Sequence, residues 1–175
     1  SASLFPEVEA HVIDMNLFVT FERHDTVDLL ERAVRAHDVV FLLPSRVYEE
    51  LTPANYPYGL PPVDDAIEAG WVEVIDDVNY TNSVVSATMD IVRRYTAAAD
   101  DRPEHDTEQA DAEVGGTTAM LLERGDATSV ADTHDLPAFR GIERALTEHG
   151  YEDRVQLVRA FDFVEAVENR YQFQR

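Results

Sequence analysis

Short runs of hydrophobic residues alternate along this chain with longer segments in which hydrophobic residues recur every three or four positions. The runs are typical of buried strands, and the spaced positions are typical of amphipathic helices. We predict strands at residues 11–14, 38–43, 71–75, 127–131 and 155–158. We predict helices at residues 25–37, 45–51, 64–69, 83–99, 107–124 and 161–171. This alternation predicts an α/β fold with three layers, α/β/α, around a mainly parallel central sheet.

Local signals mark several boundaries of these elements. Asp25 or Thr26 is suited to cap the helix at 25–37, and Ser45 is suited to cap the helix that follows the second strand. Small residues at Gly115 and Gly116 would let the helix at 107–124 pack closely on a neighbour.

Other segments lack a regular pattern. Residues 52–62 are rich in proline and predict a loop that can reach over the crevice of the sheet. Residues 99–108 are acidic and polar and predict a loop or the approach to a helix, and the piece from 132 to 140 is either helical or irregular.

The composition favours a folded, salt-adapted protein. Asp and Glu total 35 against 14 basic residues, all of them Arg, which gives a net charge of −21, while 45% of the residues are hydrophobic. A disordered acidic chain would lack that hydrophobic content. Such a charge repels itself at low ionic strength, but in molar salt the screening length falls to roughly 3 Å. We therefore expect a halophilic, archaeal, cytoplasmic protein with a single domain over residues 1–175.

Two absences in the sequence narrow the chemistry. There is no cysteine, which excludes disulfides and thiolate metal sites, so that any metal must bind oxygen or imidazole ligands. No stretch approaches about 18 consecutive apolar residues, and the N-terminus has no basic-then-apolar signal pattern. We expect neither a membrane partner nor export.

Four acidic residues from distant segments stand where a predicted strand ends or a helix begins: Asp14, Glu50, Asp111 and Asp132. The carboxyl ends of parallel strands converge on one crevice, so these carboxylates can meet there. Clustered carboxylates repel one another unless a hard divalent cation neutralises them. The pattern therefore predicts a site for a hard divalent cation and favours metal-dependent phosphodiester chemistry.

The segments around these acids resemble the PIN-domain nucleases, the family that includes the VapC-type toxins. Val-Ile-Asp-Met-Asn resembles the first strand of that family and its following acid, and Leu-Leu-Pro-Ser-Arg-Val-Tyr-Glu-Glu-Leu resembles the second strand, proline turn and helix. Ala-Asp-Ala-Glu-Val resembles the third acidic motif, and Val-Ala-Asp-Thr-His-Asp-Leu resembles the fourth. In order and spacing the motifs cover nearly the whole chain.

The resemblance implies a PIN-like fold and a metal-dependent endoribonuclease in which Asp14, Glu50, Asp111 and Asp132 are catalytic and bind one or two Mg²⁺ or Mn²⁺ ions. It implies hydrolysis of RNA that leaves a 5′-phosphate and a 3′-hydroxyl. As alternatives it implies a toxin-type nuclease held by an antitoxin-like protein partner, or an inactive PIN-like interaction domain. A homodimer is also expected by this resemblance.

Neighbouring acids compete for three of these roles. Glu49 competes with Glu50, although successive helical residues point about 100° apart, so that only one can face the site. Glu113 competes with Asp111 in the same way. In the last motif Asp135 competes with Asp132 or serves as a further metal ligand.

Further side chains have candidate supporting roles. Asn16 and Ser45 are placed to orient carboxylates or water by hydrogen bonds. Arg93 and Arg94 form an adjacent basic pair, for which pairing with nearby acids is favoured over contact with phosphate. Four tyrosines are candidates for stacking on unpaired bases, with at least half of them expected to serve in packing: Tyr48, Tyr56, Tyr58 and Tyr80.

Overall fold

A computed structural model describes residues 4–100, 109–132 and 136–172 of the protein. The strands are β1 (Ala10–Ile13), β2 (Phe41–Pro44), β3 (Val72–Ile75), β4 (Thr128–Asp132) and β5 (Val155–Arg159). They form one sheet in the order β3-β2-β1-β4-β5, and every neighbouring pair is parallel. The predicted sheet is confirmed, and its pairing within the described residues is wholly parallel.

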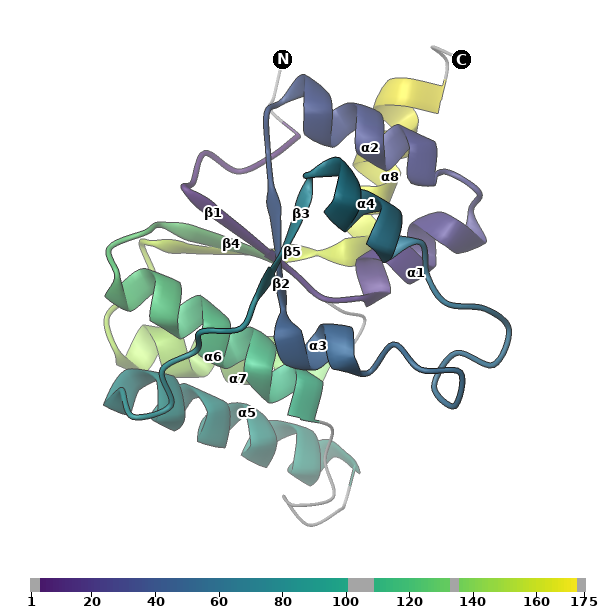
Figure 1. The fold of residues 1–175 in the computed structure, drawn as a ribbon. Helices are drawn as coiled ribbons and strands as arrows, with labels where there is room; N and C mark the ends of the chain where they lie inside the picture. The colour runs from purple at the N-terminus through teal and green to yellow at the C-terminus, as the bar shows by residue number, and fades with distance from the viewer. Residues whose placement is uncertain (1–3, 101–108, 133–135, 173–175) are drawn as a thin grey trace.

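Eight helices connect and follow these strands in the described part of the chain. They are α1 (Asn16–Arg23), α2 (Val27–Ala36), α3 (Ser45–Glu49), α4 (Val63–Ala69), α5 (Ser83–Asp100), α6 (Gln109–Glu123), α7 (Leu136–Glu148) and α8 (Ala160–Tyr171). The group α1, α2 and α8 packs together on one face of the sheet, and α3, α5, α6 and α7 pack on the other (Figure 1). The three-layer α/β/α architecture is therefore confirmed.

The chain reverses its direction across the sheet beside β1. After β1 it builds β2 and then β3 on one side, and it then crosses to the other side to build β4 and β5. In an open parallel sheet such a switch point leaves a crevice at the carboxyl ends of the two diverging strands. Here that crevice lies between the ends of β1 and β4.

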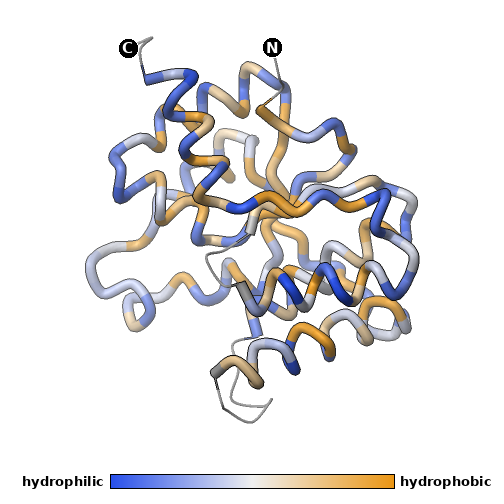
Figure 2. The backbone as a smooth tube through the Cα atoms, turned by 180° about the vertical axis from the view of Figure 1, so that it is seen from behind, coloured by the Kyte–Doolittle hydropathy of each residue, from blue (hydrophilic) through white to orange (hydrophobic). Residues whose placement is uncertain are grey.

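The hydrophobic core follows the sheet and the inner sides of the helices. In Figure 2 the hydrophobic stretches concentrate along the central strands, while most helices alternate between hydrophobic and hydrophilic residues. All four residues of β1 are buried, as expected for a central strand covered on both faces. Aromatic rings join the sheet to one helical layer, with ring centroids 6.4 Å apart between Phe41 of β2 and Phe163 of α8.

The helix α6 is buried on all its sides. Every residue from 110 to 122 is buried, because α6 lies between the sheet and α5 and α7 and also contacts α3. The two glycines predicted to allow close packing do so. An added Cβ would lie 2.8 Å from the Met89 side chain at Gly116 and 3.1 Å from Val92 Cγ2 at Gly115. This close approach fixes where the first turn of α6 lies relative to the sheet.

Some predicted boundaries were wrong. The second strand begins at Phe41 and not at Asp38, because Asp38 has a φ of 54° in the turn that ends α2. Asp tolerates this left-handed conformation better than most residues. The predicted cap at Ser45 is also wrong, since Pro44 holds the N-cap position of α3 and Ser45 is its first helical residue.

Two helices exceed their predicted extent. The apolar run at residues 17–19, which is expected to continue into a turn or the start of a helix, lies in α1, and the inner face of α1 carries buried Leu17, Phe18 and Phe21. The piece expected to run to residue 140 continues as α7 to Glu148, with buried residues at Ile142, Ala145 and Leu146. In both cases the helix is stabilised because its hydrophobic face packs against the rest of the protein, and the local sequence pattern does not reveal this packing.

Within the described residues, none of the helices combines the length and the apolar character needed to cross a membrane.

The close contact between α5 and α7 is testable at Gly141. An added Cβ there would lie 3.0 Å from the Cα of Val92, which is backbone and cannot rotate away. Gly to Ala inside a helix ordinarily stabilises by roughly 0.5–1 kcal/mol, but we predict that Gly141→Ala lowers the free energy of unfolding by about 1–3 kcal/mol through overpacking. Urea unfolding in molar KCl measures this, with Thr147→Ala, at an exposed position of the same helix, as the control. A Gly141→Ala protein at least as stable as the native one would contradict the close packing.

Candidate functional site

The ends of β1 and β4 bring two of the predicted acids together. Ile13 pairs with Ala131 in the register of the two strands, and the Asp14 backbone N–H donates to the Ala131 carbonyl oxygen at 3.4 Å. Asp14 follows Ile13 directly, and Asp132 is the last residue of β4. The backbone of these two residues therefore lies side by side at the switch point of the sheet.

The Asp14 carboxylate is buried and held in a defined orientation. Asp14 is only 7% exposed. One oxygen, Oδ1, accepts the Met15 backbone N–H at 2.8 Å, and the other, Oδ2, accepts the Asn16 side-chain Nδ2–H at 3.1 Å. The predicted orienting role of Asn16 is thus confirmed for Asp14. Hydrogen bonds of this kind fix the direction of a carboxylate ligand and stabilise its ionised form.

The helix α3 distinguishes the two neighbouring glutamates. Glu49 is exposed, whereas Glu50, at the C-cap of α3, is half-buried. The Glu50 backbone is further held by Asn55, whose Nδ2–H donates to the Glu50 carbonyl oxygen at 2.8 Å. Of the two, Glu50 is the less exposed, which favours it over Glu49 as a candidate ligand.

The first two turns of α6 carry Asp111 and Glu113, and both are buried, at 9% and 3% exposure. A buried carboxylate is costly unless it is hydrogen-bonded or paired. Glu113 accepts a hydrogen bond from the Tyr80 hydroxyl, with 2.5 Å between the oxygens. Glu113 is therefore engaged by the loop between β3 and α5.

Tyr80 joins this carboxylate to α3. Burial of its ring, together with the hydrogen bond and charge of Glu113, raises the pKa of the Tyr80 phenol above its ordinary value, and the nearby Arg46 guanidinium acts in the opposite direction. Arg46 stands four residues before Glu50, so the two occupy the same side of a helix. The sequence reasoning missed Arg46, although its spacing from Glu50 was a signal that could have found it.

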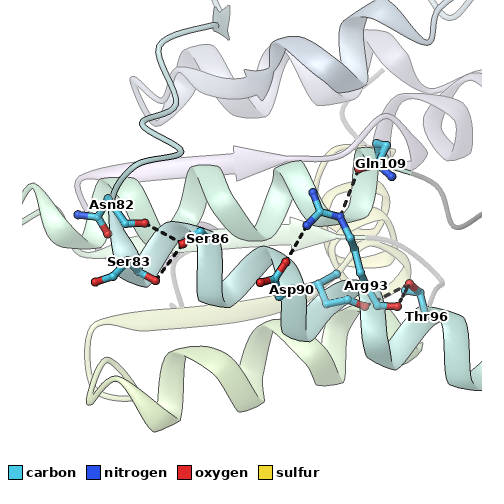
Figure 3. Close-up of polar contacts among 8 residues, drawn as sticks. Asn82, Ser83, Ser86, Asp90, Arg93, Thr96 and Gln109 are labelled. Atoms are coloured by element: carbon cyan, nitrogen blue, oxygen red, sulfur yellow. Dashed lines mark hydrogen bonds and ion pairs between the residues drawn. The ribbon is translucent and has the colours of Figure 1, made fainter. Parts of the chain in front are cut away.

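A polar contact ties α5 to the start of α6. Arg93 Nε–H donates to Gln109 Oε1 at 3.3 Å, and Arg93 also pairs with Asp90 at 3.1 Å (Figure 3). The preference for pairing of Arg93 with an acid over contact with phosphate is thus supported by Asp90. Because Gln109 begins α6, this contact helps to place the first turn that carries Asp111.

The carboxyl edge of the sheet therefore gathers the end of β1, the end of β4, the helix after β2 and the start of α6 (Figure 1). Within the ranges described, no group of three or more His, Asp or Glu side chains is arranged to hold a metal ion. Asp135, the predicted further ligand, lies outside the described residues. Asp14, Glu50 and Asp111 are described residues and do not form such a group by themselves, so the four-carboxylate set stays a prediction.

The four predicted stacking tyrosines divide in their surroundings. The Tyr48 hydroxyl donates to Asp64 at 2.7 Å, and Tyr56 is half-buried against the core. Tyr58 and Tyr80 are exposed, at 103% and 53%. The expectation that at least half serve in packing agrees with Tyr48 and Tyr56.

Comparison with known proteins gives one match. The model of a family described as the halobacterial PIN domain matches residues 7–172. No curated protein and no solved structure matches. PIN domains are generally nucleases and typically use divalent metals such as Mg²⁺, so the match indicates a nuclease-type function. It also agrees with the halophilic archaeal character expected from the charge. The match spans nearly all of the chain, and the chain therefore belongs to the halobacterial PIN domain family.

Proposed function

We propose that this protein is a metal-dependent endoribonuclease that hydrolyses RNA phosphodiester bonds. Mg²⁺ or Mn²⁺ would be held by four carboxylates, with a fifth as a further ligand: Asp14, Glu50, Asp111 and Asp132, then Asp135. The observation that carries the proposal is the Asp14 carboxylate, buried at the switch point of the sheet, oriented by Asn16 and adjacent in backbone to Asp132.

The available ligand atoms suit a hard cation. Carboxylate oxygens are what Mg²⁺ and Mn²⁺ prefer, and the chain has no thiolate to offer a softer metal. The bound ion would polarise the phosphate and lower the pKa of an attacking water.

The residues of the chain supply orientation at this edge. The Met15 backbone N–H donates to Asp14 Oδ1, and the Asn16 side-chain amide donates to Asp14 Oδ2. These two hydrogen bonds fix the orientation of the Asp14 carboxylate. Tyr80 donates a hydrogen bond to Glu113 and so orients this buried carboxylate near the start of α6. Burial of Asp14 and Asp111 limits water around them, which strengthens the electrostatic attraction of their carboxylates for a bound cation.

The acidic surface of the protein bears on how RNA would bind. A net charge of −21 opposes a polyanion, and phosphate contacts usually supply much of the affinity for nucleic acid. At about 1 M salt the screening length is roughly 3 Å, so both the repulsion and such phosphate contacts weaken. Binding would then rest on stacking, shape and the metal.

A homodimer and an antitoxin-like partner remain proposals that follow from the family resemblance.

The first prediction concerns Asp14. In molar KCl with Mn²⁺ or Mg²⁺, the native protein should cleave a labelled single-stranded RNA, and Asp14→Asn should lower the rate at least about a hundredfold, as expected when an electrostatic group of an active site is removed. Asp153→Asn, which makes the same charge change at an exposed position before β5, should leave the rate unchanged. Folded, partner-free native protein that cleaves no RNA would contradict the proposal and favour the inactive interaction domain.

The second prediction uses the two neighbouring glutamates as a matched pair. Glu50→Gln should weaken Mn²⁺ binding at least roughly tenfold, because a half-buried ligand is lost. Glu49→Gln removes the same charge one residue earlier, on the exposed side of α3, and should change the affinity less than about twofold. Calorimetric titration of metal into each protein in molar KCl measures the difference. Equal losses in both variants would show a general charge effect and refute the assignment of Glu50.

A further inference from the structure

A hollow of about 430 Å³ lies between α1 and the proline-rich loop at residues 51–62. Its lining includes Asn16 and Arg23 from α1 and Asn55, Tyr56 and Tyr58 from the loop. Its size falls within the range usual for small-molecule sites, roughly 300–1,000 Å³. The loop thus lies against α1, whose first residue, Asn16, contacts Asp14.

Two contacts connect this hollow to the predicted acids. Asn16, part of its lining, donates to Asp14 Oδ2 at 3.1 Å. Asn55, on the opposite side, donates to the Glu50 carbonyl oxygen at 2.8 Å. A group that enters the hollow is therefore one side chain away from the Asp14 carboxylate and one side chain away from the Glu50 backbone.

The loop holds its shape through its own backbone. The Asn55 and Tyr56 N–H groups donate to the Thr52 carbonyl oxygen at 3.1 and 2.9 Å, and the Gly59 N–H donates to the Tyr56 carbonyl oxygen at 3.2 Å. Pro57 and Pro61 fix their own φ angles and reduce the freedom of the free loop. The tyrosine rings are therefore offered on a partly preorganised support, which lowers the entropic cost of binding.

The chemistry of the lining fits an unpaired nucleobase. Tyr58 lines the hollow and is fully exposed, Tyr56 is half-buried against the core, and the Asn amides can donate to and accept from base edges. Arg23 adds a guanidinium that can stack or contact phosphate. Glu22 also lines the hollow. Its carboxylate repels RNA phosphates, and molar salt screens this repulsion. Stacking is not weakened by salt screening, so it suits a protein adapted to molar KCl.

Resting on the proposed nuclease function, we propose that this hollow binds one unpaired base of a single-stranded RNA by stacking on Tyr58, beside the scissile phosphate. The substrate class is then RNA with an unpaired nucleotide close to the cleavage position. A continuous duplex would be a poor substrate, because its bases are not free to enter the hollow.

The test reads stacking without cleavage. The probe is a short single-stranded RNA that carries the fluorescent base 2-aminopurine, titrated with full-length protein in molar KCl and EDTA. The native protein should quench the fluorescence, and Tyr58→Ala should weaken the affinity roughly 5- to 100-fold, the range for loss of one aromatic–base stack. Tyr58→Phe, which keeps the ring, and Leu60→Ala, an exposed residue of the same loop outside the hollow, should stay within about twofold of native.

The outcomes separate this proposal from the nuclease function. If native protein cleaves RNA in a manner that requires Asp14 while Tyr58→Ala binds as tightly as native, the stacking site is refuted and the nuclease stands. If Tyr58→Ala loses binding and quenching while the native protein cleaves nothing with metal, the base site stands and the nuclease is refuted. Absence of any binding or quenching by the native protein, or tight binding of the RNA duplex in preference to the single strand, overturns the base site.

Discussion

The arrangement of the protein depends on the position of β1 in the middle of a wholly parallel sheet. β2 and β4 flank β1, and the connections from these strands leave in opposite directions across the sheet. The carboxyl end of β1 therefore lies at the topological switch point of the sheet. Asp14 occupies that end, and its burial is compensated by a backbone N–H and by Asn16. The parallel pairing of β1 and β4 is what brings the backbones of residues 14 and 132 side by side.

The second support of the site is close packing of the helices on one face. Gly115 and Gly116 let α6 approach α5, and Gly141 lets α7 do the same. The buried helix α6 thereby carries two carboxylates into the interior, and Tyr80 engages one of them. Arg93 adds a contact between α5 and the first residue of α6. The positions of Asp111 and Glu113 on α6 therefore depend on the packing of α6 against α5, away from the carboxyl edge of the sheet.

Much of this could be predicted from the sequence, because the buried strands and amphipathic helices carry strong periodic signals. The position of Asp14 followed directly from the apolar run before it. The start of β2 was misjudged because Val39 and Val40 have high strand propensity, whereas the turn at Asp38 decides where pairing begins. The hollow beside Asn16 and the role of Tyr80 were out of reach, since each joins segments about 30 to 40 residues apart that only the tertiary fold brings together. Glu50 was placed in the candidate set from the sequence, and the exposure of Glu49 beside the half-buried Glu50 supports that choice.

The central claim is that the carboxyl edge between β1 and β4 holds a divalent metal for RNA hydrolysis. A crystal grown in molar KCl and soaked with Mn²⁺ tests it most directly, because the anomalous signal of Mn²⁺ locates the ion itself. The account predicts a peak about 2.0–2.3 Å from an oxygen of Asp14, with Asp132 as a second ligand. A crystal at saturating Mn²⁺ without a peak at this edge, or with a peak only at another place on the acidic surface, would contradict it.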